Sequence, residues 1–203
     1  MKDIEFMADQ LDALKEFMNI ALGAATAHIA SLLDAFATMQ VPSINIYNSE
    51  ELIAHIQKEM DSASKYYVVK QLFAGQFGGE FMFVMQESSA KNLENYLNNT
   101  PNPSQDDIRD SVIEVINILC STIVGRLTEE LRTEVQFFVP SAQLLDTQNI
   151  IKHEDIKQYS KIISIRTILD FKDRKVEGTI YILTKDEAIM SLKRLVDNIL
   201  EEL

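Results

Sequence analysis

The sequence carries one pattern twice, and this duplication constrains its fold more than any other feature. Near the ends of the two copies the offset is 99 residues, where GEFMFVMQESSAKNL from Gly79 aligns with GTIYILTKDEAIMSL from Gly178. A period this long with only two copies indicates duplication of a half-domain and not a solenoid. At an offset of 98 residues the recurring residues are Asp12, Glu16, Asn19 and Pro42 in the first copy and Asp110, Glu114, Asn117 and Pro140 in the second.

Each copy opens with a predicted long helix. The first is expected to begin near Asp3 and to end before Pro42, because proline removes a backbone donor and clashes with the preceding turn. Ser104 and Asp107 resemble a capping box that opens the second helix, which is expected to end before Pro140. Apolar residues spaced by three and four form one stripe on each helix. The stripes contain Leu14, Met18, Ala21, Ala25, Ile29, Leu32 and Phe36, then Val112, Ile116, Leu119, Ile123 and Leu127.

The other elements follow in a similar order in each copy. Stretches rich in β-branched and aromatic residues predict strands, and polar stretches with helical spacing predict short helices. The predicted strands are 41–47, 66–73, 80–85, 162–171 and 179–184, and the predicted helices are 50–60, 87–97 and 186–203.

The two copies are predicted to share one sheet. Residues 1–98 and 104–203 form the repeat halves, joined by the segment NNTPNPSQ at 98–105, whose Asn, Pro and Ser residues are typical of a linker. We expect an α/β (α+β) fold with pseudo-two-fold symmetry, in which a largely antiparallel sheet lies under the two long helices. A chain of 203 residues can bury such a core as one domain.

The recurring Asp, Glu and Asn share one face of each long helix. Their spacing of i, i+4 and i+7 places them within roughly 60° of arc, about 200° from the apolar stripe. Polar residues on an outer face usually indicate only solvated surface. Here they persist in both copies while their neighbours change from ALKEFMNIALGAA to VIEVINILCSTI, which indicates a retained task. Gly23 and Ser121, one turn beyond each Asn, would let another protein approach closely.

This arrangement resembles the phosphatase signature of the CheC, CheX and FliY family. The signature reads Asp or Ser, three residues, Glu, two residues, Asn, twenty-two residues and Pro, and both copies match it. The resemblance covers essentially the whole chain and is greatest to CheC, which has two such halves. CheX resembles a single-site dimeric relative, and FliY carries an appended C-terminal domain that this sequence does not show.

The resemblance implies an enzyme that hydrolyses the aspartyl-phosphate of a CheY-like response regulator. By that resemblance, Asn19 or Asn117 orients the attacking water and Glu16 or Glu114 pairs with the regulator's active-site lysine. Asp12 and Asp110 would be peripheral, and Pro42 and Pro140 would stop the helices. Mg²⁺ would be supplied by the regulator, with no cofactor of the protein's own. Family members often carry a glycine-rich stretch just after the Asn. Gly23 fits that pattern better than Ser121, so the first copy resembles the family signature more closely.

Two other interpretations stay open. The protein could be a non-catalytic adaptor that binds a phosphorylated regulator or a CheD-like partner; the family resemblance implies only that a CheD-like protein can bind. It could instead be a duplicated domain whose polar helix faces are only surface.

Composition excludes several partners. The net charge is −12 and no Lys or Arg cluster exists, so neither nucleic acid nor an anionic membrane is a predicted partner. The start MKDIEFMADQ lacks the apolar region of a signal peptide, and no apolar run approaches the roughly 20 residues of a membrane span. Together with a single cysteine, these features predict a cytoplasmic protein without membrane insertion.

The remaining candidate residues carry no chemistry. His28, His55 and His153 are too scattered to predict a metal site. Cys120 lies three residues after Asn117 and is predicted to be a small buried hydrophobe, not a nucleophile.

Overall fold

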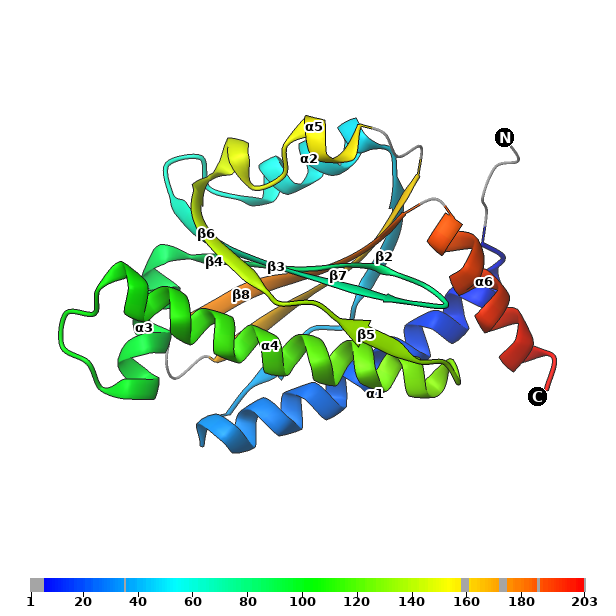
Figure 1. The fold of residues 1–203 in the computed structure, drawn as a ribbon, viewed down its shortest axis with the longest axis horizontal. Helices are drawn as coiled ribbons and strands as arrows, with labels where there is room; N and C mark the ends of the chain where they lie inside the picture. The colour runs from blue at the N-terminus through cyan, green and yellow to red at the C-terminus, as the bar shows by residue number, and fades with distance from the viewer. Residues whose placement is uncertain (1–5, 35, 158–160, 172–174, 186, 203) are drawn as a thin grey trace.

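Eight strands form one antiparallel sheet that separates two layers of helices (Figure 1). The computed structural model describes residues 6–34, 36–157, 161–171, 175–185 and 187–202. The strand order is β1-β7-β8-β4-β3-β5, with β2 also paired to β7 and β6 also paired to β3. The strands are β1 Thr38–Met39, β2 Ser43–Tyr47, β3 Lys65–Gly75, β4 Gly79–Gln86, β5 Val135–Phe137, β6 Ser141–Asp146, β7 Ile162–Phe171 and β8 Val176–Lys185.

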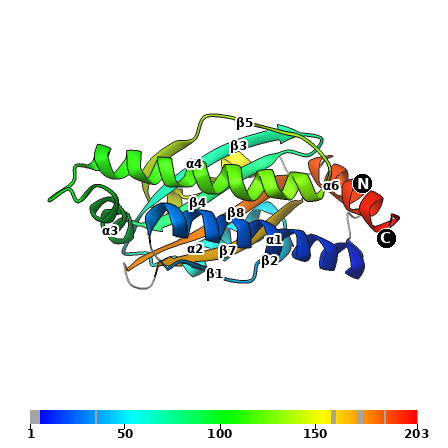
Figure 2. The same cartoon turned by 90° about the horizontal axis from the view of Figure 1, so that it is seen from below.

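Helices cover both faces of the sheet. Figures 1 and 2 show α1 and α4 side by side on one face, flanked by α3 and α6, with α2 and α5 on the opposite face. The helices are α1 Ala8–Leu33, α2 Ser49–Glu59, α3 Glu87–Asn98, α4 Gln105–Glu130, α5 His153–Ile156 and α6 Glu187–Leu200, with a single 3₁₀ turn η1 at Thr147–Asn149. The predicted mixed fold with a largely antiparallel sheet is confirmed.

The centre of the sheet relates the two copies. In the pairing of β4 with β8, Phe81 lies opposite Ile182 and Phe83 lies opposite Ile180. Under the 99-residue offset Phe81 corresponds to Ile180 and Phe83 to Ile182, so each residue pairs with the equivalent of the other. Met82 pairs with its own equivalent, Tyr181. This is the register that a two-fold relation between the halves requires.

The two copies also exchange their short strands. β1 and β2, from the first copy, pair with β7 of the second, whereas β5 and β6, from the second copy, pair with β3 of the first. Each copy therefore completes the sheet of the other, and neither half contains all the pairing partners of its own strands.

Two apolar cores lie on opposite faces of the sheet. The larger one joins α1, α3, α4 and α6 to inward side chains such as Val69 and Phe83, and the smaller one joins α2 and α5 to side chains such as Tyr66 and Tyr181. Neighbouring residues of one strand enter different cores because side chains alternate across a sheet. The sheet is thus buried on both faces at its centre.

The long helices are shorter than predicted. α1 begins at Ala8 after Met7, not near Asp3, which lies outside the described residues. It ends at Leu33, because Asp34 adopts a left-handed conformation with φ 43° that cannot continue the helix. α4 ends at Glu130, and Arg132 is left-handed with φ 51°.

The prediction that Pro42 and Pro140 stop the helices is therefore wrong. Each helix has already ended eight or more residues before its proline. The predicted stripe of the first helix also fails at its end. Leu32 and Phe36 are 52% and 69% exposed, and Leu33 occupies the buried position instead.

Most other predicted elements are present. α2, α3, α6, β3, β4, β7 and β8 match their predicted ranges within a few residues, although Asp186 and Leu203, at the ends of the last predicted helix, lie outside the described residues. Ser104 caps α4 as predicted, since the Asp107 carboxylate accepts a hydrogen bond of 2.9 Å from the Ser104 backbone N–H. Five short elements were not predicted from the sequence, namely β1, β5, β6, α5 and η1.

α1 and α4 are each long and apolar enough, by length and composition, to cross a membrane. Neither helix contains an uninterrupted apolar run of that length, because polar residues such as Glu16 and Asn117 interrupt it. Both helices pack along the sheet through one face and carry Asp, Glu and Asn on the exposed face. Such burial is that of core helices in a globular fold.

A glycine within the central strand β8 predicts a stability difference. A Cβ at Gly178 would overlap the ring of Phe83, which is fully buried, so the ring would have to shift within the core. We expect Gly178→Ala to lower the free energy of unfolding by about 1–3 kcal/mol through overpacking, measured by urea denaturation. Gly23→Ala is the control, because a Cβ there meets no atom within 4 Å. The control should be neutral or more stable, since alanine favours a helix by roughly 0.5–1 kcal/mol.

The single thiol, Cys120, is predicted to react at different rates in folded and unfolded protein. Cys120 is fully buried on α4, and this burial raises the pKa of its thiol to about 12. At pH 8 the folded protein should hold roughly a thousandfold less thiolate than an exposed cysteine of ordinary pKa. Alkylation by iodoacetamide should therefore be slow in native protein and fast in urea. Rapid native labelling would contradict the assignment of Cys120 to the core.

Candidate active site

The six recurring polar residues of α1 and α4 are all exposed. Asp12 forms an ion pair of 3.5 Å with Lys15, and Asp110 forms one of 3.4 Å with Arg109. Within the described part of the chain, Glu16 and Glu114 make no ion pair. The two carboxylates most available to an approaching protein are therefore the two glutamates. The exposed set is Asp12, Glu16, Asn19, Asp110, Glu114 and Asn117.

The two Asn residues form separate sites. Figure 2 shows that α1 and α4 lie side by side and run in opposite directions. They meet where His28 Nδ1 lies 3.2 Å from Thr122 Oγ1. Asn19 precedes His28 by nine residues and Asn117 precedes Thr122 by five. At the rise of an α-helix, the two amides are about 20 Å apart along the helix direction.

A bulge in the neighbouring strand lies beside each Asn. Phe138 N–H donates to the Leu72 carbonyl at 3.0 Å, while Ser141 pairs with Lys70. Two residues, Val139 and Pro140, therefore face the single residue Gln71, which defines a β-bulge.

The first copy has the same bulge. Gln40 N–H donates to the Ile168 carbonyl at 3.1 Å and Ser43 pairs with Arg166, so Val41 and Pro42 face Thr167. A proline is tolerated here because a bulge on an edge strand does not need its missing N–H.

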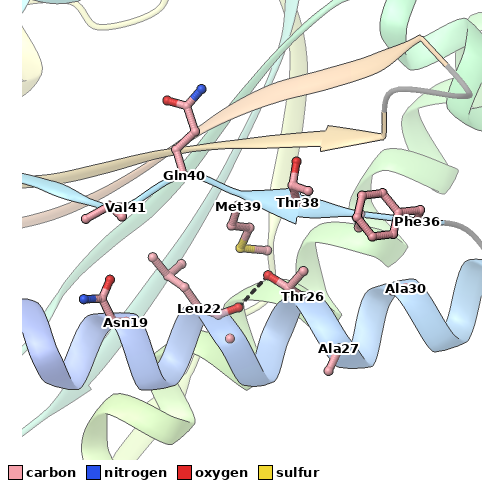
Figure 3. A pocket seen from close by; sticks show the side chains of 12 residues that line it. Asn19, Leu22, Thr26, Ala27, Ala30, Phe36, Thr38, Met39, Gln40 and Val41 are labelled. Atoms are coloured by element: carbon pink, nitrogen blue, oxygen red, sulfur yellow. Dashed lines mark hydrogen bonds between the residues drawn. The ribbon is translucent and has the colours of Figure 1, made fainter.

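The bulges give the motif prolines a role that replaces the predicted helix stop. At each bulge the residue before the proline projects into solvent, with Val41 78% and Val139 91% exposed. Figure 3 shows Val41, in the segment between β1 and β2, on the side of Asn19 on α1. Val41 thus lines the same groove as Asn19, and in the second copy Val139 belongs to the bulge opposite Gln71, whose side chain donates to Asn117.

An open groove of about 560 Å³ extends from Asn19 along α1. Its floor is the outer face of α1 and its wall is the segment 36–41 (Figure 3). Small residues such as Gly23 and Ala27 line it, and a Cβ at Gly23 would meet open space. Asn19 and the small residue one turn after it therefore lie in the same open groove.

The second site contains a buried polar residue that sequence analysis missed. Gln71, on β3, is 2% exposed, and its Nε2 donates to Asn117 Oδ1 at 3.1 Å and to the Phe138 carbonyl at 3.0 Å. The signal was present in the strand YYVVKQLF, where a glutamine occupies an inward position between Val69 and Phe73.

The remaining candidates lie apart from the site chemistry. His28 contacts Thr122, His55 stacks on Tyr47 with ring centroids 5.2 Å apart, and His153 is exposed at the start of α5. Among the described residues, no three His, Cys, Asp or Glu side chains come together as a metal site.

The fold resembles those of known structures, although no protein-family model and no curated protein matches the sequence. FliY of Thermotoga maritima superposes with a TM-score of 0.75 at 11% identity, covering 96% of this chain and 99% of that one. The FliM middle domain of H. pylori gives 0.60 at 12% identity, covering 94% and 99%. CheX of Desulfovibrio desulfuricans gives 0.53 at 14% identity, covering 83% and 99%. The chain therefore has the fold that FliY, FliM and the chemotaxis protein CheX share.

Proposed function

We propose that the protein is a phosphatase that hydrolyses the aspartyl-phosphate of a CheY-like response regulator. One observation supports this function above all. Each long helix presents an exposed Asn amide, with a glutamate one turn before it that forms no ion pair within the described residues, and each bulge presents an exposed valine. The similarity of the fold to FliY and CheX structures agrees with the proposal.

The proposed reaction needs a positioned water more than a strong base. The water oxygen bonds to phosphorus, the bond from phosphorus to the aspartyl oxygen breaks, and the products are inorganic phosphate and a free carboxylate. Phosphoryl transfer depends mainly on positioning and charge stabilisation. An amide offers a donor and an acceptor at fixed geometry, so Asn19 or Asn117 can orient that water. Mg²⁺ would come with the phosphorylated regulator.

The glutamates are proposed to dock the regulator. Glu16 and Glu114 lie one turn before each Asn, on the same helix face, and remain free of ion pairs within the described chain. A lysine next to the regulator's phosphorylation site would provide an opposite charge, and complementary charges raise association rates. The exposed Val41 and Val139 offer apolar contact beside each docking point.

An adaptor without turnover is the second candidate, because an exposed amide and an exposed glutamate on one helix face could also bind a partner without catalysis. Such a protein would bind a phosphorylated regulator, or a CheD-like partner, in fixed stoichiometry. An enzyme added at a small fraction of the regulator concentration should instead clear all of the phosphorylated form. Localisation in the cytoplasm, where such regulators work, is part of the same proposal.

Removal of both amides tests the catalytic assignment. We expect Asn19→Ala combined with Asn117→Ala to lower the rate of regulator dephosphorylation at least about 100-fold, because the water loses its positioning group. The measurement is single-turnover loss of phosphate from labelled regulator. Asn95→Ala is a matched control, since Asn95 is also an exposed helical asparagine but lies on α3. Unchanged turnover in the double variant would refute the proposed roles.

Loss of the docking charges should affect binding more than chemistry. We expect Glu16→Gln combined with Glu114→Gln to raise KM for the phosphorylated regulator several-fold with a smaller change in kcat. The effect should shrink as salt rises, because exposed charges are screened. Asp106→Gln, at an exposed carboxylate in the first turn of α4, is the control. An equal fall in kcat and kcat/KM would instead place the glutamates in the transition state.

A further inference from the structure

The side chain of Gln71 can have only one orientation. The Phe138 carbonyl is an acceptor only, so the group that faces it at 3.0 Å must be the Nε2 donor of Gln71. The second hydrogen of the same Nε2 points to Asn117 at 3.1 Å, and a donor there requires Oδ1 as its partner. The bulge carbonyl thus determines the orientation of Gln71, and Gln71 determines the orientation of the Asn117 amide.

A fixed Asn117 amide has a defined outward face. Its Oδ1 accepts from the buried Gln71, so its Nδ2 group, which donates to no described residue, is the part presented to an incoming regulator. One lone pair of Oδ1 also remains available to accept a hydrogen bond. Both capacities that water orientation needs are therefore present at Asn117 before the partner arrives.

The first site has no equivalent support. The sheet register places Thr167 at the position of Gln71, because each faces the bulge of its neighbouring strand. Thr167 Oγ1 donates to the Gln40 carbonyl at 2.6 Å, as Gln71 does to Phe138, but this hydroxyl makes no bond to Asn19. Within the described residues no hydrogen bond restrains the Asn19 side chain, and Figure 3 draws none from it.

Satisfying the Phe138 carbonyl does not require a glutamine at position 71. Thr167 shows that a hydroxyl satisfies the equivalent carbonyl from a buried position. Gln71 satisfies it with a larger amide whose Oε1 is buried without a hydrogen-bond partner in the described structure. A buried unpaired acceptor is unfavourable. What the glutamine adds is the bond to Asn117.

We propose that Gln71 is a positioning residue that presets the amide of Asn117, so that the two sites differ and the Asn117 site is the faster one. This inference rests on the proposed phosphatase function. It reverses the expectation from sequence that the first copy is closer to type, because Gly23 eases access to Asn19 whereas Gln71 orders Asn117. Preorganised groups accelerate a reaction more than mobile ones, since their ordering need not occur during the reaction.

The kinetic test isolates each site in turn. We expect Asn117→Ala to reduce kcat more than Asn19→Ala does. In the Asn19→Ala background, Gln71→Thr should lower kcat about tenfold with little change in KM, because the misplaced amide still permits docking. In the Asn117→Ala background the same Gln71→Thr change should have no effect on kcat. Thr is chosen because it can keep the bond to the Phe138 carbonyl, as Thr167 keeps its own.

Equal effects of Gln71→Thr in both backgrounds would overturn the proposal, as would a larger loss from Asn19→Ala than from Asn117→Ala. Urea denaturation of each variant separates a folding defect from a positioning defect. If Gln71→Thr does not fold, Gln71→Met, which keeps the length and removes the donors, is tested in the same two backgrounds.

A second measurement does not depend on phosphatase activity. In wild-type protein, NMR order parameters of the side-chain amides should be high for Asn117 and low for Asn19, and Gln71→Thr should lower that of Asn117 toward that of Asn19. Low order at both residues in wild type would overturn the positioning role. High order at Asn117 without any regulator dephosphorylation would retain that role and refute the phosphatase function instead.

Discussion

The antiparallel pairing of β4 with β8 is the contact on which the rest of the structure depends. Met82 and Tyr181, equivalent residues of the two copies, lie opposite each other at its centre and are fully buried. A one-residue slip would turn every side chain of a strand to the wrong face, so the two apolar cores hold this register. With the register fixed, the helices α1 and α4 are placed side by side on the same face, and their polar surfaces face away from the sheet.

Strand exchange makes each site a product of both copies. Asn117 belongs to the second copy, yet Gln71, which contacts it, belongs to the first. The bulge beside Asn19 belongs to the first copy, and Thr167 of the second satisfies its carbonyl. A change in one copy can therefore alter the site of the other. This coupling allows two sites of common origin to diverge without any change in the motif residues themselves.

The bulges also explain why one proline recurs with each set of Asp, Glu and Asn. A proline cannot donate to a sheet ladder, and at an edge bulge no such bond is needed. Each bulge exposes a valine, Val41 or Val139, and Val41 lines the same groove as Asn19. The prolines thus belong to bulges with an exposed valine, and the helices end nine and ten residues before them.

The sequence alone determined the duplication, most long elements and the exposed face of each helix. Periodicity in Leu14, Met18, Val112 and Ile116 predicts which helix face is buried, because burial follows a local repeat of about 3.6 residues. It could not place the short strands β1, β5 and β6, whose two to six half-exposed residues carry no clear period. The predicted helix ends were also wrong. The first helix ends at Asp34 in a left-handed conformation, which glycine adopts more often, so the sequence gives no strong signal there.

Tertiary structure alone decided what surrounds each Asn. Gln71 and Asn117 are 46 residues apart, and their hydrogen bond exists only because β3 of one copy passes under α4 of the other. No local pattern records such a contact, because it depends on strand exchange between the copies. The sequence therefore determined that two matching amides face solvent, and the packing of the sheet decided that one is held by a buried partner while the other is not.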